Sequence, residues 1–242
     1  MLAAVAAPLA ATVVPDFGRS SNCVRNDGTF CWDWFQQHWG DTFQPRLIEH
    51  IELSAIALGI GFAIAFAAAL VANRYGWFET PFSILSGFLY TIPSLALFQV
   101  LVPITGIGWT TVEIPLVSYT LLIIFRNTLT GLREVPDDVR EAARGMGLTP
   151  AQTLWRVELP LAMPAIIAGV RVAAVTVISL ATVAAIILPE GLGYPIFLAL
   201  QSPFNTQFIA AGALAVLLAI TTDALLVIAQ RFLTPWARMA RS

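Results

Sequence analysis

Residues 133–166 read REVPDDVREAARGMGLTPAQTLWRVELPLAMPAI, and this charged block decides how the rest of the chain is organised. Twelve of its residues before Ala162 are Arg, Asp, Glu, Gln or Thr, whereas long apolar runs lie on both sides. Such a block cannot enter hydrocarbon, because charged side chains there are costly. We therefore expect a water-facing unit between two membrane spans, and we name residues 131–164 the platform.

The composition indicates a membrane protein. The chain has 242 residues, is 57% hydrophobic and only 12% charged, about half the charged share of a typical soluble domain. We predict an all-α polytopic membrane protein with about five spans of roughly 20 residues: residues 51–72, 82–102, 114–129, 165–188 and 208–229. Pro93 predicts a kink or a break in the second span. Four small residues recur in the first span and would let another helix approach closely: Ala55, Gly59, Ala63 and Ala67.

The distribution of Arg predicts the orientation. Arg residues lie in loop 73–81, in the platform and near the C-terminus, whereas loops 103–113 and 189–207 have none. By the positive-inside rule, the platform and the C-terminus are cytoplasmic and the N-terminus lies outside the cell membrane. This divides the chain into an extracytoplasmic segment (1–45), a transmembrane domain (46–235) and a cytoplasmic tail (236–242).

The N-terminal segment allows several interpretations. Residues 1–15 are apolar but too short to span as a helix, and they lack the basic start of a secretory signal; they form either an interfacial segment or a signal-like one. Residues 32–39 hold three Trp residues, which predicts a short helix at the headgroup layer. Cys23 and Cys31 either pair as a disulfide, if the compartment is oxidising, or remain free thiols.

Charged residues near the membrane differ between the predicted cytoplasmic and outer ends of the spans. Arg126, Arg171 and Asp223 lie toward the cytoplasmic span ends, where we expect snorkelling with one Asp–Arg pair, or else part of an inner gate. Four carboxylates lie near the outer ends, where we expect solvation at headgroup level or attraction of a cationic substrate: Glu49, Glu52, Glu113 and Glu190. His38 and His50 are isolated in sequence, and we assign them packing or interfacial roles.

Capping patterns predict two short helices in the platform. Asp138 followed by Glu141 has the form of an acidic capping box, and a helix over 139–146 would stop at Gly147. Thr149, Pro150 and Gln152 then form a second N-terminus, with a helix over 150–157 that ends at Leu159-Pro160. The outward surface mixes charged and small apolar residues, which favours docking of a soluble partner: Arg140, Glu141, Arg144, Arg156, Ala142, Ala143, Leu148 and Leu154.

The spacing in this block resembles a known family signature. Glu141-Ala142-Ala143, three residues, Gly147, nine residues, Val157, one residue and Leu159-Pro160 match the EAA motif of binding-protein-dependent ABC importer permeases. The layout is similar to the MetI-like permease fold. The resemblance implies that the platform carries the cytoplasmic coupling helices, which enter a groove in an ATPase subunit.

Further stretches resemble the osmoprotectant branch, whose permeases move glycine betaine, choline, carnitine or related quaternary amines. These stretches are residues 90–96 (YTIPSLA), 125–128 (FRNT) and 141–147 (EAARGMG). The chain departs from that branch at Leu188-Pro189-Glu190, where a glycine-alanine-glycine is usual before Gly191-Leu192-Gly193. The departure puts the geometry of this outer loop in question.

The resemblance implies a transport subunit and not an enzyme. The chain has no Walker A loop and no metal-ligand spacing, so ATP and Mg²⁺ would bind to a separate ATPase subunit. A second permease subunit, identical or similar, and an extracytoplasmic substrate-binding protein would complete the importer. No segment is basic enough to indicate a nucleic-acid partner. Candidates for the translocation path are Tyr90, Pro93, Arg126 and Asn127.

Three alternatives remain open on the sequence. One is a permease for an amino acid such as methionine. Another is a non-ABC channel or receptor whose platform binds a signalling protein and needs no ATPase. An intramembrane enzyme would need a polar catalytic group at mid-membrane depth, and the spans offer mainly Ser, Thr and Asn without an evident base.

Overall fold

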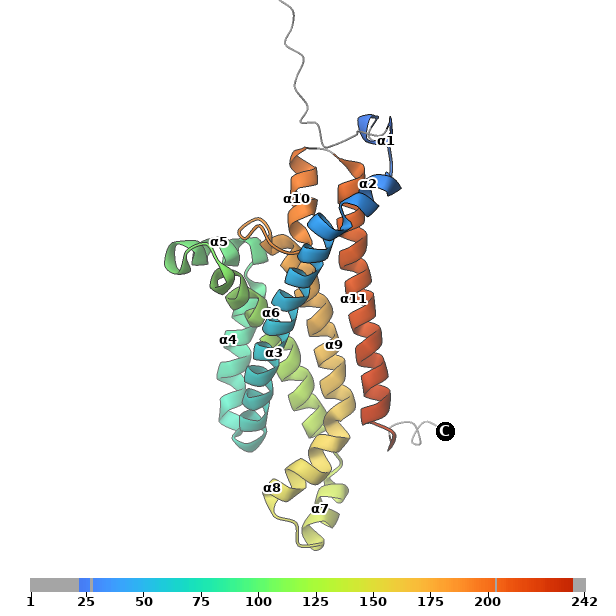
Figure 1. Cartoon of the computed structure of the whole chain (residues 1–242). Coiled ribbons are helices and arrows are strands. Elements are labelled where there is room, and N and C mark those ends of the chain that lie inside the picture. The colour runs from blue at the N-terminus through green and yellow to red at the C-terminus, as the bar shows by residue number, and fades with distance from the viewer. Residues whose placement is uncertain (1–21, 27, 203, 237–242) are drawn as a thin grey trace, which may run out of the picture.

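The computed structural model describes residues 22–26, 28–202 and 204–236, and all regular structure in these ranges is helical. Four helices there are long and apolar enough to cross a membrane (Figure 1): α3 (Gln44–Arg74), α6 (Trp109–Arg133), α9 (Leu159–Ala184) and α11 (Asn205–Leu233). They confirm the first, third, fourth and fifth predicted spans. The predictions for residues 1–15 lie outside the described residues.

The second predicted span is broken at Pro93. Helix α4 (Glu79–Thr91), which follows the 3₁₀ turn η2 (Gly76–Phe78), and helix α5 (Ser94–Thr105) meet at a bend of 98°. Thirteen residues of α4 reach only about 20 Å at 1.5 Å per residue, which is less than the thickness of the hydrocarbon core. Ile92 takes the extended conformation that a following proline favours. The expected break is therefore confirmed, and α5 turns sideways instead of completing a straight crossing.

Helix α6 forms the centre of the bundle and packs between α3 and α9. Gly169 of α9 permits this approach, because a Cβ there would lie 2.5 Å from the Cβ of Asn127. No described helix of this chain approaches closely at the predicted small-residue stripe of α3, since all four of its residues are exposed and a Cβ at Gly59 would meet no atom within 4 Å. Another face of α3 makes the contact, through Ala57, Gly61, Ala65, Ala69 and Ala72. A helix that is apolar all round does not reveal from sequence which face is internal.

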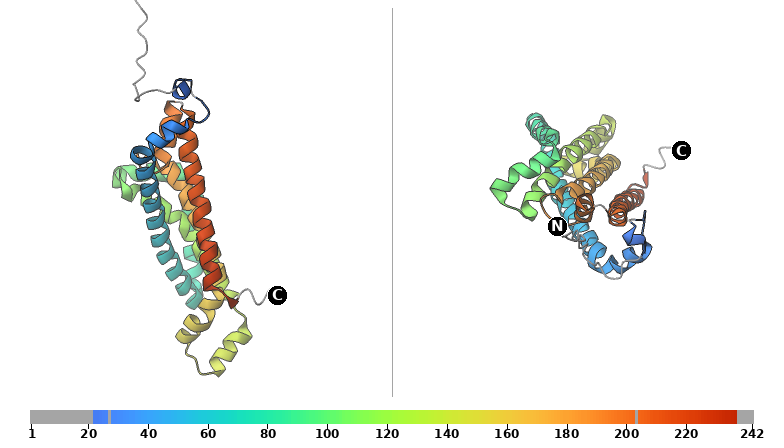
Figure 2. Two further views of the ribbon diagram at one scale, coloured as in Figure 1. Left: turned by 45° about the vertical axis from the view of Figure 1, so that its right-hand side comes forward. Right: turned by 90° about the horizontal axis from the view of Figure 1, so that it is seen from above.

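The N-terminal segment folds onto the end of the bundle that lies opposite the platform (Figure 1). It comprises α1 (Asn22–Arg25), α2 (Trp32–Gln37) and the π-helical turn η1 (Trp39–Phe43), which runs directly into α3. Cys23 and Cys31 form a disulfide. Phe43 is fully buried against Ala210 and Ala211 of α11, with Trp34 and Phe35 packed around it. Figure 2 shows this segment beside α11 at the edge of the bundle.

The expected interfacial helix over 32–39 is therefore corrected in two respects: it ends at Gln37, and its aromatic rings pack partly on the protein. Trp32 remains exposed. Helix α10 (Gly193–Gln201), which the sequence did not predict, lies at the same end. The platform helices α7 (Asp137–Gly145) and α8 (Pro150–Thr153) lie at the opposite end, as does the C-terminal end of α11 (Figure 1).

Candidate functional site

The first platform helix begins earlier than predicted. Helix α7 starts at Asp137, and Pro136 is its N-cap with φ −59° and ψ 143°, without a side-chain capping bond. The predicted acidic capping box at Asp138 is wrong, because an N-cap residue must have non-helical backbone angles and Asp138 already lies in the helix. Asp137 and Asp138 instead occupy the first turn, where carboxylates interact favourably with the helix dipole.

Gly147 terminates α7 as predicted. Its φ is 81°, in the left-handed region. The N–H of Gly147 donates to Arg144 O at 2.9 Å, and the N–H of Leu148 donates to Ala143 O at 3.2 Å, which together make a Schellman motif. A Cβ at Gly147 would meet no atom within 4 Å. The glycine is therefore required by backbone conformation and not by space.

The second platform helix has the predicted start but a different end. The Thr149 side chain accepts from Gln152 N while the Gln152 side chain accepts from Thr149 N, which confirms the capping box. The helix does not stop at Leu159-Pro160, because α8 continues through the π-helical turn η3 (Leu154–Glu158) into α9. Pro160 has no N–H to donate, and the wider π-helical turn before it accommodates the missing bond. The platform is thus joined to α9 without a loop.

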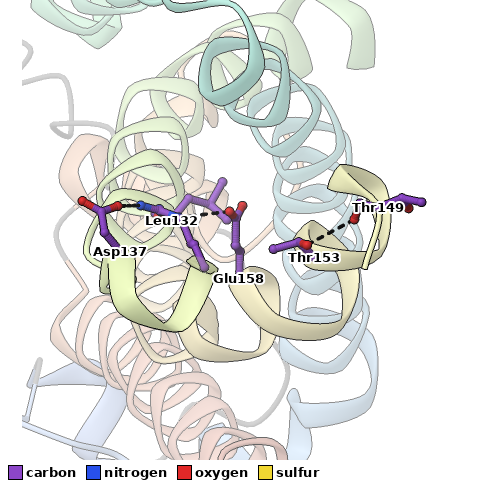
Figure 3. Close-up of polar contacts among 6 residues, drawn as sticks. Leu132, Asp137, Thr149, Thr153 and Glu158 are labelled. Carbon is purple, nitrogen blue, oxygen red and sulfur yellow. Dashed lines mark hydrogen bonds and ion pairs between the residues drawn. The ribbon is translucent and has the colours of Figure 1, made fainter. Parts of the chain in front are cut away.

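Arg140 ties the platform together, a role that the sequence did not reveal. Its guanidinium donates to Glu158 Oε1 at 3.1 Å, to Asp137 Oδ1 at 2.9 Å and to Leu132 O at 2.7 Å. It therefore links α7, η3 and the end of α6. Figure 3 shows Asp137, Leu132 and Glu158 on one side of the platform and the Thr149–Thr153 contact on the other.

The residues of the EAA motif divide into an exposed and a buried group. Glu141 and Ala142 are exposed on α7, whereas Ala143 is only 1% exposed. Leu159 is buried with Leu132, Ala162 and Ile166; Val157 and Pro160 are half-buried. The predicted outward surface is therefore wrong at two positions, because Ala143 is buried and Arg140 is engaged in ion pairs. The exposed face of α7 consists of Asp137, Asp138, Glu141, Ala142, Arg144 and Gly145, and the C-cap Met146 after it is also exposed.

The four path candidates fall at two separate places. Tyr90 and Pro93 lie at the break between α4 and α5, where the hydroxyl of Tyr119 donates to Ile92 O. The Tyr90 and Tyr119 rings are 5.6 Å apart, so α6 supports the break. Arg126 and Asn127 lie about 10 Å further along α6, at 1.5 Å per residue from Tyr119.

Asn127 and Arg126 have different surroundings. Asn127 donates to Ile123 O at 2.8 Å and faces Gly169 in the contact between α6 and α9. Arg126 is exposed. The expected Asp–Arg pair between spans is confirmed: Arg171 of α9 and Asp223 of α11 make two hydrogen bonds of 2.8 and 2.9 Å.

The loop over 189–192, which contains the sequence departure and is predicted to be an outer loop, is tied to the start of α3. Arg46 Nη1 donates to Pro189 O at 2.6 Å, and Glu49 Oε2 accepts from Gly191 N at 2.8 Å. The fully buried His50 accepts from Leu192 N through Nδ1, at 3.3 Å, and its Nε2 is 3.0 Å from Ile178 O. His50 therefore has a packing role, as expected.

Three of the four carboxylates predicted near the outer ends are not simply solvated. Glu49 forms an ion pair with Arg46 at 2.9 Å. Burial, followed by the nearby Glu49, raises the pKa of Glu190. Both carboxylate oxygens of Glu113 are buried without a hydrogen-bond partner among the described residues. Within those residues no group of three or more His, Cys, Asp or Glu could hold a metal ion.

The sequence match with a known family agrees with this geometry. Residues 55–239 match the family described as "Binding-protein-dependent transport system inner membrane component". The chain belongs to this family. It is thus the membrane-spanning permease subunit of a binding-protein-dependent importer, and we refer to it below as the permease.

Two relatives and one solved structure illustrate the similarity. The permease is 37% identical to a choline transport system permease protein of Bacillus subtilis, over 83% of this chain and 93% of the relative. It is 35% identical to a glycine betaine/carnitine/choline transport system permease protein of the same organism, over 77% and 85%. A solved structure of the MetNI methionine ABC transporter in an inward-facing conformation has a TM-score of 0.67 at 22% identity, over 78% of this chain and 94% of that one. This last likeness concerns the fold.

Proposed function

We propose that the permease forms the translocation path of an ATP-driven importer for a quaternary-amine osmoprotectant such as glycine betaine, choline or carnitine. The observation that carries the substrate class is the identity of 37% and 35% to permeases named for these compounds, along most of their length. The three compounds share a trimethylammonium group. The stretches over 90–96, 125–128 and 141–147 support the same branch.

The platform faces the cytoplasm and receives the ATPase. Its Arg residues support this orientation, and so does the Cys23–Cys31 disulfide at the other end, since disulfides persist in oxidising compartments. The N-terminal segment then lies outside. ATP and Mg²⁺ bind to the separate ABC ATPase subunit.

The exposed Glu141 and Ala142 of α7 contact the ATPase. Gly147 fixes the angle between the two platform helices. Val157, Leu159 and Pro160 transmit displacement, because α8, η3 and α9 form one uninterrupted helical unit. Movement of the platform therefore reorients α9 against α6, and alternating access follows from this rigid-body motion.

The remaining subunits complete the path. A second permease, either another copy or a similar chain, lines it from the opposite side, and an extracytoplasmic binding protein delivers the substrate to the outer end. Tyr90 and Pro93 line the path at the break between α4 and α5, and Arg126 with Asn127 lies nearer the cytoplasmic side.

Uptake by the complete complex tests the substrate class. Proteoliposomes that contain the permease, its ATPase and its binding protein are supplied with labelled glycine betaine, choline or methionine, with and without internal ATP. We expect ATP-dependent accumulation of at least one quaternary amine and none of methionine. Accumulation of methionine alone would contradict the proposal.

A further inference from the structure

A cavity of 940 Å³ lies between the end of α3 and the platform. Its walls come from four parts of the chain: Leu70, Asn73 and Arg74 of α3, Arg133 at the end of α6, residues of α7, and residues of α8 and η3. Thr149 and Thr153, on the right in Figure 3, belong to the wall formed by the second platform helix. The cavity therefore joins the first span to the platform.

The charges that line this cavity are unbalanced. Four Arg residues and only two acidic residues contribute to the walls: Arg74, Arg133, Arg140, Arg144, Asp137 and Glu158. Arg133 pairs with Glu79, and Arg140 pairs with Asp137 and Glu158. Arg74 and Arg144 have no acidic partner within 4 Å among the described residues. Two guanidinium groups from different helices thus remain available to an anion.

Exposed aromatic residues place the cavity at the depth of the lipid headgroups. Tyr75 and Trp77 lie one and three positions after Arg74 in the chain and are 55% and 73% exposed. Trp155, which follows the cavity residue Leu154, is 61% exposed. Tyr and Trp are enriched where a membrane protein crosses the boundary between hydrocarbon and water. The mouth of the cavity therefore lies beside phospholipid headgroups.

The lining also contains apolar surface from Leu70, Leu154, Pro150 and Ala151. A wall that is both cationic and apolar suits an amphiphile better than a small inorganic anion. We propose that this cavity binds the headgroup of an anionic phospholipid, with Arg74 and Arg144 contacting its phosphate. The inference goes beyond the transport role and does not depend on which substrate is carried.

A bound lipid would connect α3 with the platform. The phosphate contacts Arg74 on the first span and Arg144 near the C-terminal end of α7. It thereby restrains the unit that we propose to move during transport, and the anionic lipid content of the membrane sets how firmly the platform is held.

Native mass spectrometry of the delipidated full-length permease, titrated with phosphatidylglycerol or phosphatidylcholine, tests the proposal. We expect Arg74→Gln and Arg144→Gln each to weaken phosphatidylglycerol binding about fivefold, and the double variant about thirtyfold. Arg74→Lys with Arg144→Lys keeps the charges and should retain most of the affinity. The matched control is Arg156→Gln, because Arg156 is an exposed platform residue that does not line the cavity.

Four results would overturn the proposal. The first is equal binding of the two lipids by the wild-type permease, a result that does not depend on the folding of any variant. The second is a loss of phosphatidylglycerol affinity in Arg156→Gln that is as large as the loss in the double Gln variant. The third is unchanged phosphatidylglycerol binding by that double variant. The fourth is displacement of the lipid by millimolar inorganic phosphate, which would assign the cavity to a soluble anion.

A separate measurement distinguishes this site from ATPase docking. If an acidic group of the ATPase occupies the cavity, the double Gln variant loses co-purification with the ATPase while its lipid affinity stays unchanged. That outcome contradicts the lipid site and leaves the proposed transport function intact.

Discussion

The platform and the outer loop over 189–192 lie at opposite ends of the permease and are held in different ways. The hydrogen bonds of the platform helices α7, α8 and η3 are local, and the longest joins Arg140 to Glu158, 18 positions away; among the described platform residues only Arg133, at the end of α6, pairs with a more distant residue, Glu79. The outer loop is held by α3 through contacts that span 142 or 143 positions. A unit that is held mostly by its own residues can move as one piece, whereas the outer loop must follow α3.

The largest effect is expected from breaking the platform turn. Gly147→Pro cannot adopt the observed φ of 81°, because proline holds φ near −65°. We expect uptake to fall to background while the permease remains in the membrane. Gly147→Ala is the matched control, since the space is open and only about 1 kcal/mol of backbone strain is added. Normal uptake by the Pro variant would show that the angle of the turn is irrelevant.

Removal of Arg140 should loosen the platform as a whole. Arg140→Ala leaves Glu158 without its cation and Leu132 O without its donor, at a cost of about 2 kcal/mol given the partial exposure of the pair. Hydrogen exchange of the amides over 137–158 measures this loss. Arg156→Ala, at an exposed position of the same unit, should leave the exchange unchanged. Equal protection in both variants would contradict the role of Arg140.

The outer loop should respond to a change in α3 that is distant in sequence. His50→Leu removes the acceptor for Leu192 N and leaves that amide unsatisfied in a buried site, which costs about 2 kcal/mol. We expect faster hydrogen exchange over 189–193 with no change in the platform. Ile51→Val, at the exposed position next to His50, is the control. Faster exchange in the platform as well would show that the two ends are not independent.

The smallest effect concerns Glu190 and depends on pH. Burial raises the pKa of the Glu190 carboxyl in the folded state. As pH rises, the carboxyl therefore loses its proton in the unfolded chain before it does so in the folded chain, and the stability of the folded state falls. The neutral Glu190→Gln variant avoids this loss. It should slow exchange in the outer loop at pH 7 relative to the wild type, and the difference should disappear below the pKa of an unfolded glutamate. A difference that persists at low pH would contradict a charge effect.

The comparison also explains what the sequence could predict. The Thr149 capping box and the left-handed Gly147 depend on residues within one or two turns, so the local sequence pattern was sufficient to predict both. The capping assignment of Asp138 failed because Pro136 starts the helix earlier, and the stop at Leu159-Pro160 failed because a π-helical turn accommodates the proline. These competing local solutions are not distinguished by spacing alone.

Tertiary contacts were the main part that the sequence could not predict. Nothing in the pattern around His50 indicates that its ring meets the backbone at Leu192. The exposed stripe with Gly59 and the buried one with Gly61 look alike in sequence, and only packing against α6 separates them. The role of Arg140 was missed for the same reason, since its partners depend on how α7 folds back on η3.

The most direct test of the proposed coupling reverses the chemistry of the exposed face of α7. Glu141→Arg with Ala142→Asp changes two exposed residues of the motif and leaves its buried residues, Ala143 and Leu159, unchanged. The control is Glu134→Arg, which repeats the Glu-to-Arg substitution at an exposed residue outside α7. We predict that the double variant reaches the membrane but loses both uptake and co-purification with the ATPase, whereas the control keeps both. Normal uptake and co-purification in the double variant would contradict the coupling role.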